Sequence, residues 1–182
     1  MNPCVFFLGL HGVGKTTVGR KLQSEHNWMH ISLGDLGRLA RARRLPREHS
    51  VRFMGYLASQ QPGERLNRSL IDSLLLEVEN HRSHRLVSVD GFPAEPYHVG
   101  LLPPNSLLVH LTAPESTRTE RLAKRGEATV RQWSNKSAGS QRDRDLPAIL
   151  EHHREKILEL DATEPVDTVV RRILALIYRQ TA

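Results

Sequence analysis

The sequence has almost no cysteine and no long apolar run. Cys4 is the only cysteine among the 182 residues, so no intramolecular disulfide can form, and we expect Cys4 to act as a small buried apolar residue. No stretch of about 18 consecutive apolar residues occurs, which argues against a transmembrane helix. The apolar residues 3–10 are few and follow no basic region, so they predict a strand and not a signal peptide. These features favour a cytoplasmic protein without a membrane partner.

Aromatic residues and lysines are also scarce. Aromatic residues make up 5% of the chain, and only five of its 26 basic residues are lysine. Single-stranded nucleic acids are bound by basic grooves that carry stacking aromatic side chains, and no such interleaving is found here. Nucleic acid is therefore not the favoured partner, although the net charge of +6 leaves it open. The arginine excess also fits a protein that binds phosphate groups, because guanidinium forks hold phosphate oxygens in pairs.

The order of apolar segments predicts a single α/β domain over residues 1–182. Strands are expected at residues 3–8, 29–32, 85–89, 106–111 and 156–160, and helices at 14–26, 34–45, 50–59, 64–80, 114–125, 146–156 and 165–180. Strands that alternate with helices predict a three-layer fold, with a parallel sheet covered on both faces and ligands at the carboxyl ends of the strands. The polar stretch 126–145 lacks apolar periodicity and is expected to be a short mobile lid.

Residues 9–16 match the phosphate-loop pattern G-x-x-x-x-G-K-[S/T], between a predicted strand and a predicted helix. The glycines let backbone N–H groups face phosphate oxygens, and the N-terminus of the helix adds partial positive charge. Lys15 is predicted to reach the β- and γ-phosphates of ATP, and the Thr16 hydroxyl to ligate Mg²⁺. The predicted ATP-binding residues of this loop are Gly9, Gly12, Val13, Gly14, Lys15, Thr16 and Thr17. His11 is expected to point to solvent and has no assigned chemistry.

The segment "RLVSVD" (85–90) is an apolar strand that ends in an acid. In P-loop proteins a second strand of this form holds the metal ion or its water. Asp90 is therefore predicted to take part in Mg²⁺ binding with Thr16 at the substrate site. The alternative, an aspartate that only makes a turn or caps a helix, stays open.

The segment "SLGDLGR" (32–38) is the candidate acceptor side. Asp35 and Arg38 are three residues apart and can share one face of a helix that begins at Gly34. Arg38 is predicted to bind an acceptor phosphate. Asp35 is predicted to contact the substrate, either as a base or only as the cap of its helix.

A second arginine cluster follows the fourth predicted strand. Its members are Arg118, Arg121, Arg125, Arg131, Arg142 and Arg144. Spacings of three and four place the first three on one helix face, and the next two bracket the polar stretch. Either these arginines close on the phosphates of ATP and stabilise the transferring group, or they form a charged surface helix and a solvated loop.

These motifs, in this order, resemble the adenylate kinase family of nucleoside monophosphate kinases. Besides the phosphate loop, the resemblance rests on "GDLGR" (34–38), "VDGFP" (89–93), "ERLAKRGE" (120–127) and "LDATEPVDTVV" (160–170), and it spans nearly the whole chain. It implies a five-stranded parallel sheet, ATP and Mg²⁺ as cofactors, and mobile acceptor (about 32–80) and lid segments. It further implies that Arg38 binds the acceptor phosphate and that Asp90 helps to hold Mg²⁺. The residues implied to contact the transferring phosphates are Arg121, Arg125, Arg131 and Arg142.

The acceptor side departs from this family's pattern at three positions. The family usually has an arginine after "DGFP" that binds the acceptor phosphate, where this chain has Ala94. The glutamine that reads the adenine of AMP corresponds to His98, which is accordingly predicted to contact the substrate. The threonine before "GD" is Leu33. In addition, the start of the phosphate loop, "GLHGVGKTTVGRKL" (9–22), is more similar to shikimate kinase and related small-metabolite kinases.

Three functions follow as hypotheses. The first is an ATP-dependent nucleoside monophosphate kinase, and the second is a kinase of a hydroxyl-bearing metabolite, similar to shikimate or gluconate kinases. The third is an ATP-binding regulatory protein or a nucleic-acid-associated ATPase. In each case a monomer or a small homo-oligomer is expected.

Overall fold

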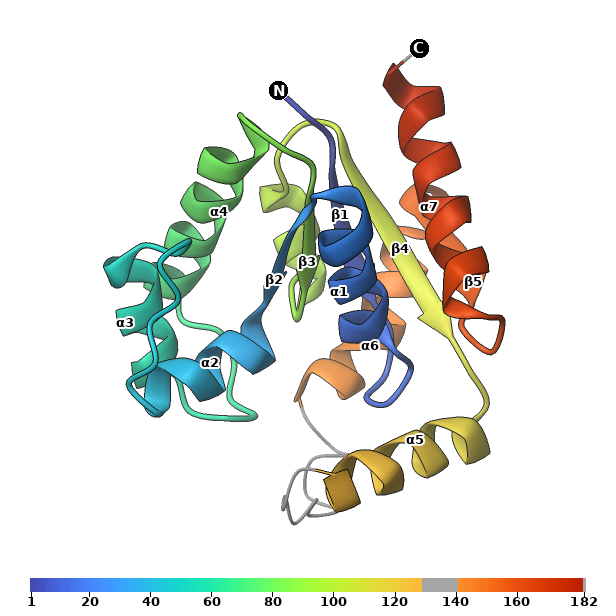
Figure 1. The fold of residues 1–182 in the computed structure, drawn as a ribbon, viewed down its shortest axis with the longest axis horizontal. Coiled ribbons are helices and arrows are strands. Elements are labelled where there is room, and N and C mark those ends of the chain that lie inside the picture. The colour runs from blue at the N-terminus through green and yellow to red at the C-terminus, as the bar shows by residue number, and fades with distance from the viewer. Residues whose placement is uncertain (129–140, 182) are drawn as a thin grey trace.

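The computed structural model describes the backbone of residues 1–128 and 141–181 and the side chains of residues 1–124 and 143–179. Five parallel strands form one sheet in the order β2-β3-β1-β4-β5. They are β1 (Cys4–Leu8), β2 (Met29–Ser32), β3 (Val87–Asp90), β4 (Ser106–Thr112) and β5 (Ile157–Asp161). Helices lie on both faces of the sheet, and Figure 1 shows the three layers. The predicted fold class is therefore confirmed.

The alternation of side chains along β1 builds two cores, one on each face of the sheet. Val5 and Phe7 pack with α1 (Lys15–His26) and α7 (Val166–Thr181). Cys4, Phe6 and Leu8 face the opposite side. That core also takes in residues of α2 (Leu33–Arg41), α3 (Val51–Ser59), α4 (Arg68–Arg82) and α6 (Gln141–His152). Since successive side chains of a strand point to opposite faces, an all-apolar strand must be covered on both sides.

Cys4 has the buried position that the sequence predicts. It is fully buried, and its Sγ lies 3.3 Å from the Ser106 hydroxyl. Burial raises the pKa of the Cys4 thiol, with a smaller opposing effect from the hydrogen bond to Ser106. A thiol held in the protonated form in the core acts as a small apolar group.

Most predicted elements occur within a few residues of their expected bounds, and the exceptions have local causes. Helix α2 ends at Arg41 and not at residue 45, because Arg43 adopts a positive φ of 55° and the Arg44 N–H returns to the Leu39 carbonyl. Helix α4 begins at Arg68 and not at residue 64, because the Asn67 side chain accepts a hydrogen bond from the Leu70 N–H at 2.8 Å and caps it.

The region of the predicted lid differs from the expectation at both ends. Helix α5 (Glu115–Ala128) extends past residue 125, and α6 begins at Gln141, so both ends of the stretch 126–145 are helical. Residues 129–140, the middle of that stretch, lie outside the described residues. The short 3-10 helix η1 (Pro96–Leu101) was not predicted, and η3 (Arg154–Lys156) forms the last part of the helix expected over 146–156. Within residues 1–128 and 141–181, no helix is long and apolar enough to cross a membrane.

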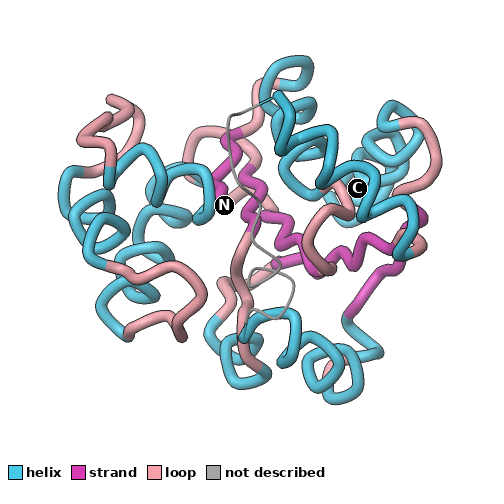
Figure 2. Tube along the Cα trace, turned by 90° about the horizontal axis from the view of Figure 1, so that it is seen from below, coloured by secondary structure: helices cyan, strands magenta, loops and turns pink. Residues whose placement is uncertain are grey.

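Figure 2 shows the molecule from the side at which the parallel strands end. Helices α2, α3 and α4 form one group beside the sheet, and α5 lies apart from them on this side (Figures 1 and 2). The loop between β1 and α1, the start of α2 and the turn after β3 lie on this side. Ligands of open α/β sheets bind at this edge.

Candidate active site

The phosphate loop connects β1 to α1, as its pattern predicts. Its backbone needs glycine at two points in particular. A Cβ on Gly9 would lie 2.5 Å from the Leu111 carbonyl oxygen, and one on Gly12 would lie 2.8 Å from the Arg118 carbonyl oxygen. Both residues have positive φ, 134° and 82°, a region that L-residues rarely adopt. The loop is therefore packed tightly against β4 and α5.

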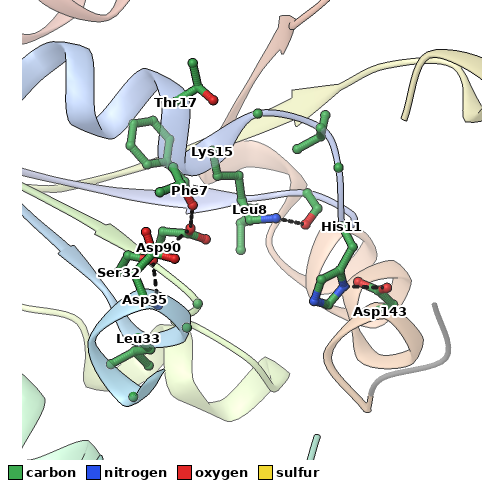
Figure 3. A pocket seen from close by; sticks show the side chains of 18 of the residues that line it. Phe7, Leu8, His11, Lys15, Thr17, Ser32, Leu33, Asp35, Asp90 and Asp143 are labelled. Carbon is green, nitrogen blue, oxygen red and sulfur yellow. Dashed lines mark hydrogen bonds and ion pairs between the residues drawn. The ribbon is translucent and has the colours of Figure 1, made fainter. Parts of the chain in front are cut away.

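Lys15 is the first residue of α1, and its ammonium group is directed back into the loop. Its Nζ donates to the carbonyl oxygens of Gly9 at 2.6 Å and Leu10 at 3.1 Å. Lys15 therefore holds its charge on the cavity side of the loop, where Figure 3 shows it.

Thr16 and Asp90 meet across two neighbouring strands. The pairing of β1 with β3 sets Phe7 opposite Asp90, which brings the end of β3 to the phosphate loop. The Thr16 hydroxyl donates to Asp90 Oδ2 at 2.7 Å. Asp90 is the last residue of β3 and only 9% exposed, so it is not an exposed turn residue, and the N-cap of the next helix, η1, is Glu95. The predicted proximity of these two side chains is present in the structure.

Ser32 is a third oxygen-bearing side chain at this point, and the sequence reasoning did not single it out. Its hydroxyl donates to Asp90 Oδ2 at 3.4 Å and also accepts a hydrogen bond from the Asp35 N–H at 3.4 Å, which makes Ser32 the N-cap of α2. Helix α2 thus begins at Leu33, one residue before the predicted start. The available signal was its place at the end of the second predicted strand, whereas its position opposite Asp90 follows from the pairing of β2 with β3.

Asp35 and Arg38 share one face of α2, and a residue of α1 joins them. The Asp35 carboxylate accepts hydrogen bonds from the guanidinium groups of both Arg20 and Arg38. The Asp35 side chain is 15% exposed and that of Arg38 is 35% exposed. The interpretation of Asp35 as the cap of its helix is wrong, because Ser32 holds that position. Its carboxylate forms ion pairs at the wall of the cavity.

Arg121 of α5 links the phosphate loop to the turn after β5. Its Nη1 donates to the Val13 carbonyl oxygen at 2.9 Å, and its Nη2 donates to the Ala162 carbonyl oxygen at 2.8 Å. Arg118 donates to the His11 carbonyl oxygen at 3.3 Å. Of the other predicted phosphate-binding arginines, Arg131 lies outside the described residues, as do the side chains of Arg125 and Arg142.

His11 does not simply point to solvent. Its Nδ1 lies 2.8 Å from Asp143 Oδ2 of α6, and the two side chains are 37% and 14% exposed. Figure 3 shows this contact at the outer end of the phosphate loop. The difference arises because α6 begins earlier than predicted and brings Asp143 to the loop.

One cavity of about 1230 Å³ is lined both by residues of the phosphate loop and by residues of α2. Among the predicted site residues, those that line it are Gly9, Gly12, Val13, Gly14, Lys15, Thr16, Thr17, Asp35, Arg38, Asp90 and Arg121. Lining residues that were not predicted include Arg20, Ser32, Arg41, Gln60, Gln61 and Lys124. The cavity therefore extends from the phosphate loop to α2 and the segment after α3.

His98 lies elsewhere. It is fully buried, its Nδ1 accepts from the N–H groups of Ala94 at 3.1 Å and Glu95 at 3.2 Å, and its ring stacks on Phe92 with centroids 4.8 Å apart. It is not among the described residues that line the cavity. His98 therefore stabilises the turn that follows β3 through these two hydrogen bonds. Ala94 is buried in the same region, whereas Leu33 does line the cavity.

The fold and the loop together define a P-loop kinase of the adenylate and shikimate kinase type, and comparisons with known proteins agree. Adenylate kinase 1 of Schistosoma mansoni is 25% identical over 180 residues, which are 93% of this chain and 89% of that protein. Adenylate kinase isoenzyme 1 of Rattus norvegicus is 26% identical over 180 residues, 93% of this chain and 91% of that protein. A gluconokinase from Sinorhizobium meliloti 1021 has the same fold, with a TM-score of 0.54 at 19% identity over 98% of this chain and 93% of that one.

A family model described as AAA domain matches residues 5–142. The chain belongs to this AAA domain family. Its match contains the phosphate loop, the end of β3 and the second arginine cluster except Arg144.

Proposed function

We propose that the protein transfers the γ-phosphoryl group of ATP to a nucleoside monophosphate. The observation that carries this proposal is the continuity of the cavity, which joins the phosphate loop to a wall of α2 that bears Arg38 and Arg41. An acceptor phosphate is already ionised and needs no base, but cationic groups must offset its repulsion by ATP. Two guanidinium groups on the acceptor wall meet that requirement.

On the donor side, the loop amides and Lys15 would bind the phosphates of ATP, and Arg121 would lie beside them. The donor set for Mg²⁺ fits, because the Thr16 hydroxyl and the Asp90 carboxylate are hard oxygen ligands that already lie 2.7 Å apart. Once bound, the ion would neutralise charge that develops on the phosphate oxygens. The predicted roles of Arg125, Arg131 and Arg142 on the transferring phosphate are part of the same proposal.

A second candidate function is a kinase of a hydroxyl-bearing metabolite, and two observations favour it. At position 94 a buried methyl group stands where the adenylate kinase pattern has an arginine. The Asp35 carboxylate lies on the cavity wall, where it could accept a proton from a hydroxyl group. Against this role, Arg20 and Arg38 both donate to Asp35, and a carboxylate stabilised by two cations is a weak base.

An acceptor panel with ATP and Mg²⁺ separates these functions. We expect AMP, CMP, UMP, GMP or a deoxynucleotide to yield a diphosphate and ADP, measured by chromatography of both nucleotides. Shikimate and gluconate serve as hydroxyl acceptors, and reactions without acceptor serve as the control for hydrolysis. Phosphorylation of a polyol without formation of any diphosphate would overturn the first proposal. Turnover of ATP only after addition of RNA or DNA would overturn both.

A further inference from the structure

Three potential metal ligands lie together outside the phosphate cavity. His49 comes just before α3, and Glu77 and His81 lie on α4. The side chains of His49 and Glu77 are 2% and 4% exposed, and that of His81 is 15% exposed. None of the three lines the cavity that holds the phosphate loop.

The spacing of their ligand atoms matches a metal centre. His49 Nδ1 lies 3.1 Å from Glu77 Oε1, and His81 Nε2 lies 3.5 Å from the same oxygen. One ligand atom from each residue falls within 4.8 Å of the other two. Zinc–ligand bonds of about 2.0–2.2 Å in a tetrahedron place neighbouring ligand atoms roughly 3.3–3.6 Å apart. The distance from His81 lies within this range, and the distance from His49 is about 0.2 Å shorter than its lower limit.

Residues around the three side chains hold them in place. The i,i+4 spacing sets Glu77 and His81 on one face of α4. Ser50 donates to the Glu77 carboxylate twice, from its N–H at 3.1 Å and from its hydroxyl at 2.9 Å. Hydrogen bonds from residues that do not themselves bind the ion orient carboxylate ligands and increase the metal affinity. Burial alone would raise the pKa of Glu77, but the hydrogen bonds from His49, His81 and Ser50 together hold it well below its usual range.

We propose that His49, Glu77 and His81 bind one zinc-class divalent ion that fastens the start of α3 to α4. Two imidazole nitrogens and one carboxylate oxygen form a set that suits Zn²⁺, with water as the fourth ligand of the tetrahedron, whereas Mg²⁺ prefers oxygen ligands throughout. His49 and Glu77 are 28 residues apart, so the ion would cross-link two parts of the acceptor segment. His81, the most exposed of the three, marks the side from which an ion enters.

The site has a structural role in this proposal and does not take part in phosphoryl transfer. It stands independently of the proposed function, because its ligands, its test and its readout involve neither ATP nor an acceptor. The competing explanation is a hydrogen-bonded network that satisfies the buried Glu77 without a metal ion. That network would bind no zinc.

The test is Zn²⁺ binding to the full-length, tag-free protein after treatment with EDTA and dialysis. We expect one equivalent to bind, measured by competition with a chromogenic chelator, and Co²⁺ in its place to give the visible absorption of a tetrahedral centre. His81→Gln and the double variant His49→Gln/His81→Gln should weaken binding at least about 100-fold, because even outer hydrogen-bond partners of metal ligands contribute 10–100-fold. Ser50→Ala should lower affinity by about tenfold.

His152→Gln is the matched control, because this exposed histidine neighbours His153 and offers a surface site for nonspecific zinc. Its zinc affinity should equal that of the wild-type protein. Zinc should also raise the Tm of the wild-type protein and of His152→Gln, but not that of His81→Gln. Failure of the wild-type protein to bind zinc, or an undiminished equivalent in His81→Gln, would overturn the proposal. Circular dichroism verifies that each variant is folded.

Discussion

At the scale of single residues, Gly19 shows how tightly α1 sits on the sheet. His30 of β2 is 7% exposed, and its Nδ1 lies 2.9 Å from the Ser88 hydroxyl. A Cβ on Gly19 would fall 2.0 Å from Cε1 of the His30 ring. Because the ring is enclosed and close to Asp90, it has little room to move aside. Gly19 is thus required for the close approach of α1 to β2.

We predict that Gly19→Ala destabilises the protein by about 3 kcal/mol, the upper end for an overpacked core. Gly55→Ala is the control, because Gly55 also lies in a helix but a Cβ there meets nothing within 4 Å. It should stabilise the fold by about 0.5–1 kcal/mol, the usual gain of alanine over glycine in a helix. Urea denaturation measures both. Equal effects of the two substitutions would contradict the prediction, whereas partial recovery in Gly19→Ala/His30→Ala would support it.

Site residues could be predicted from the sequence where the residues that act together are close to one another in the chain. The phosphate loop is such a case, since its pattern, strand and helix are adjacent in the chain. The approach of Asp90 to Thr16 was predictable from the form of a strand that ends in an acid. Ser32 and Arg41 reach the cavity only through tertiary packing. His98 follows a motif, but it lies within η1, where its buried ring accepts hydrogen bonds from the backbone of the preceding turn.

At the scale of elements, a cluster of charges joins α1 to α2. Arg20 from α1 and Arg38 from α2 both donate to Asp35. The cluster lies on the cavity wall, so Arg38 can turn to an acceptor phosphate only by giving up part of its interaction with Asp35. The charge on Asp35 would therefore compete with a phosphate acceptor for Arg38, whereas a hydroxyl acceptor would need the same charge as its base.

We predict that Asp35→Asn changes kcat/KM by less than about tenfold with a phosphate acceptor, because that reaction needs no base and Arg38 becomes freer to bind. With a hydroxyl acceptor the loss should reach about 10²–10⁴-fold, the usual contribution of a general base. Asp72→Asn is the matched control, since Asp72 pairs with Arg68 at the exposed surface of α4. Steady-state kinetics with both acceptor types decide this, and equal losses with both would contradict it.

The type and order of the strands and α-helices could be predicted from the sequence, whereas several of their ends could not. Buried strands such as β1 are continuous apolar runs, so a short stretch of sequence is enough to predict them. Leu66 fits the apolar period of α4 but lies before the Asn67 cap, so the period alone places the start of the helix too early. The end of α2 depends on the positive φ of Arg43. Because non-glycine residues rarely adopt this conformation, the sequence does not predict it.

At the scale of the whole molecule, the strand order brings the donor half and the acceptor half to one edge. Strand β1 lies at the centre of the sheet, between β3 and β4. The phosphate loop therefore has Asp90 on one side and α5, which follows β4, on the other. Binding of ATP at this point would contact both halves of the sheet and should stabilise the entire fold.

We predict that ATP at 100 times its Kd stabilises the wild-type protein by about 2.7 kcal/mol, which corresponds to a rise in Tm of roughly 5–10 °C for a chain of this size. Lys15→Ala should lose most of this shift and all phosphoryl transfer, because the main cation on the phosphates is gone. Lys21→Ala is the control with the same change in charge, since Lys21 pairs with Glu25 and Asp167 away from the cavity. Thermal denaturation with and without ATP tests this, and an undiminished shift in Lys15→Ala would remove the loop from nucleotide binding.

The hydrogen bonds of Arg121 have a consequence for local unfolding. Its guanidinium reaches Val13, 108 residues away in the sequence, and Ala162, 41 residues away. Arg118 and the backbone of Gly12 pack at the same junction. We therefore expect the phosphate loop, the first two turns of α5 and the turn after β5 to open together, with a common free energy of opening. The nucleotide would then meet a surface whose three parts are ordered or disordered together.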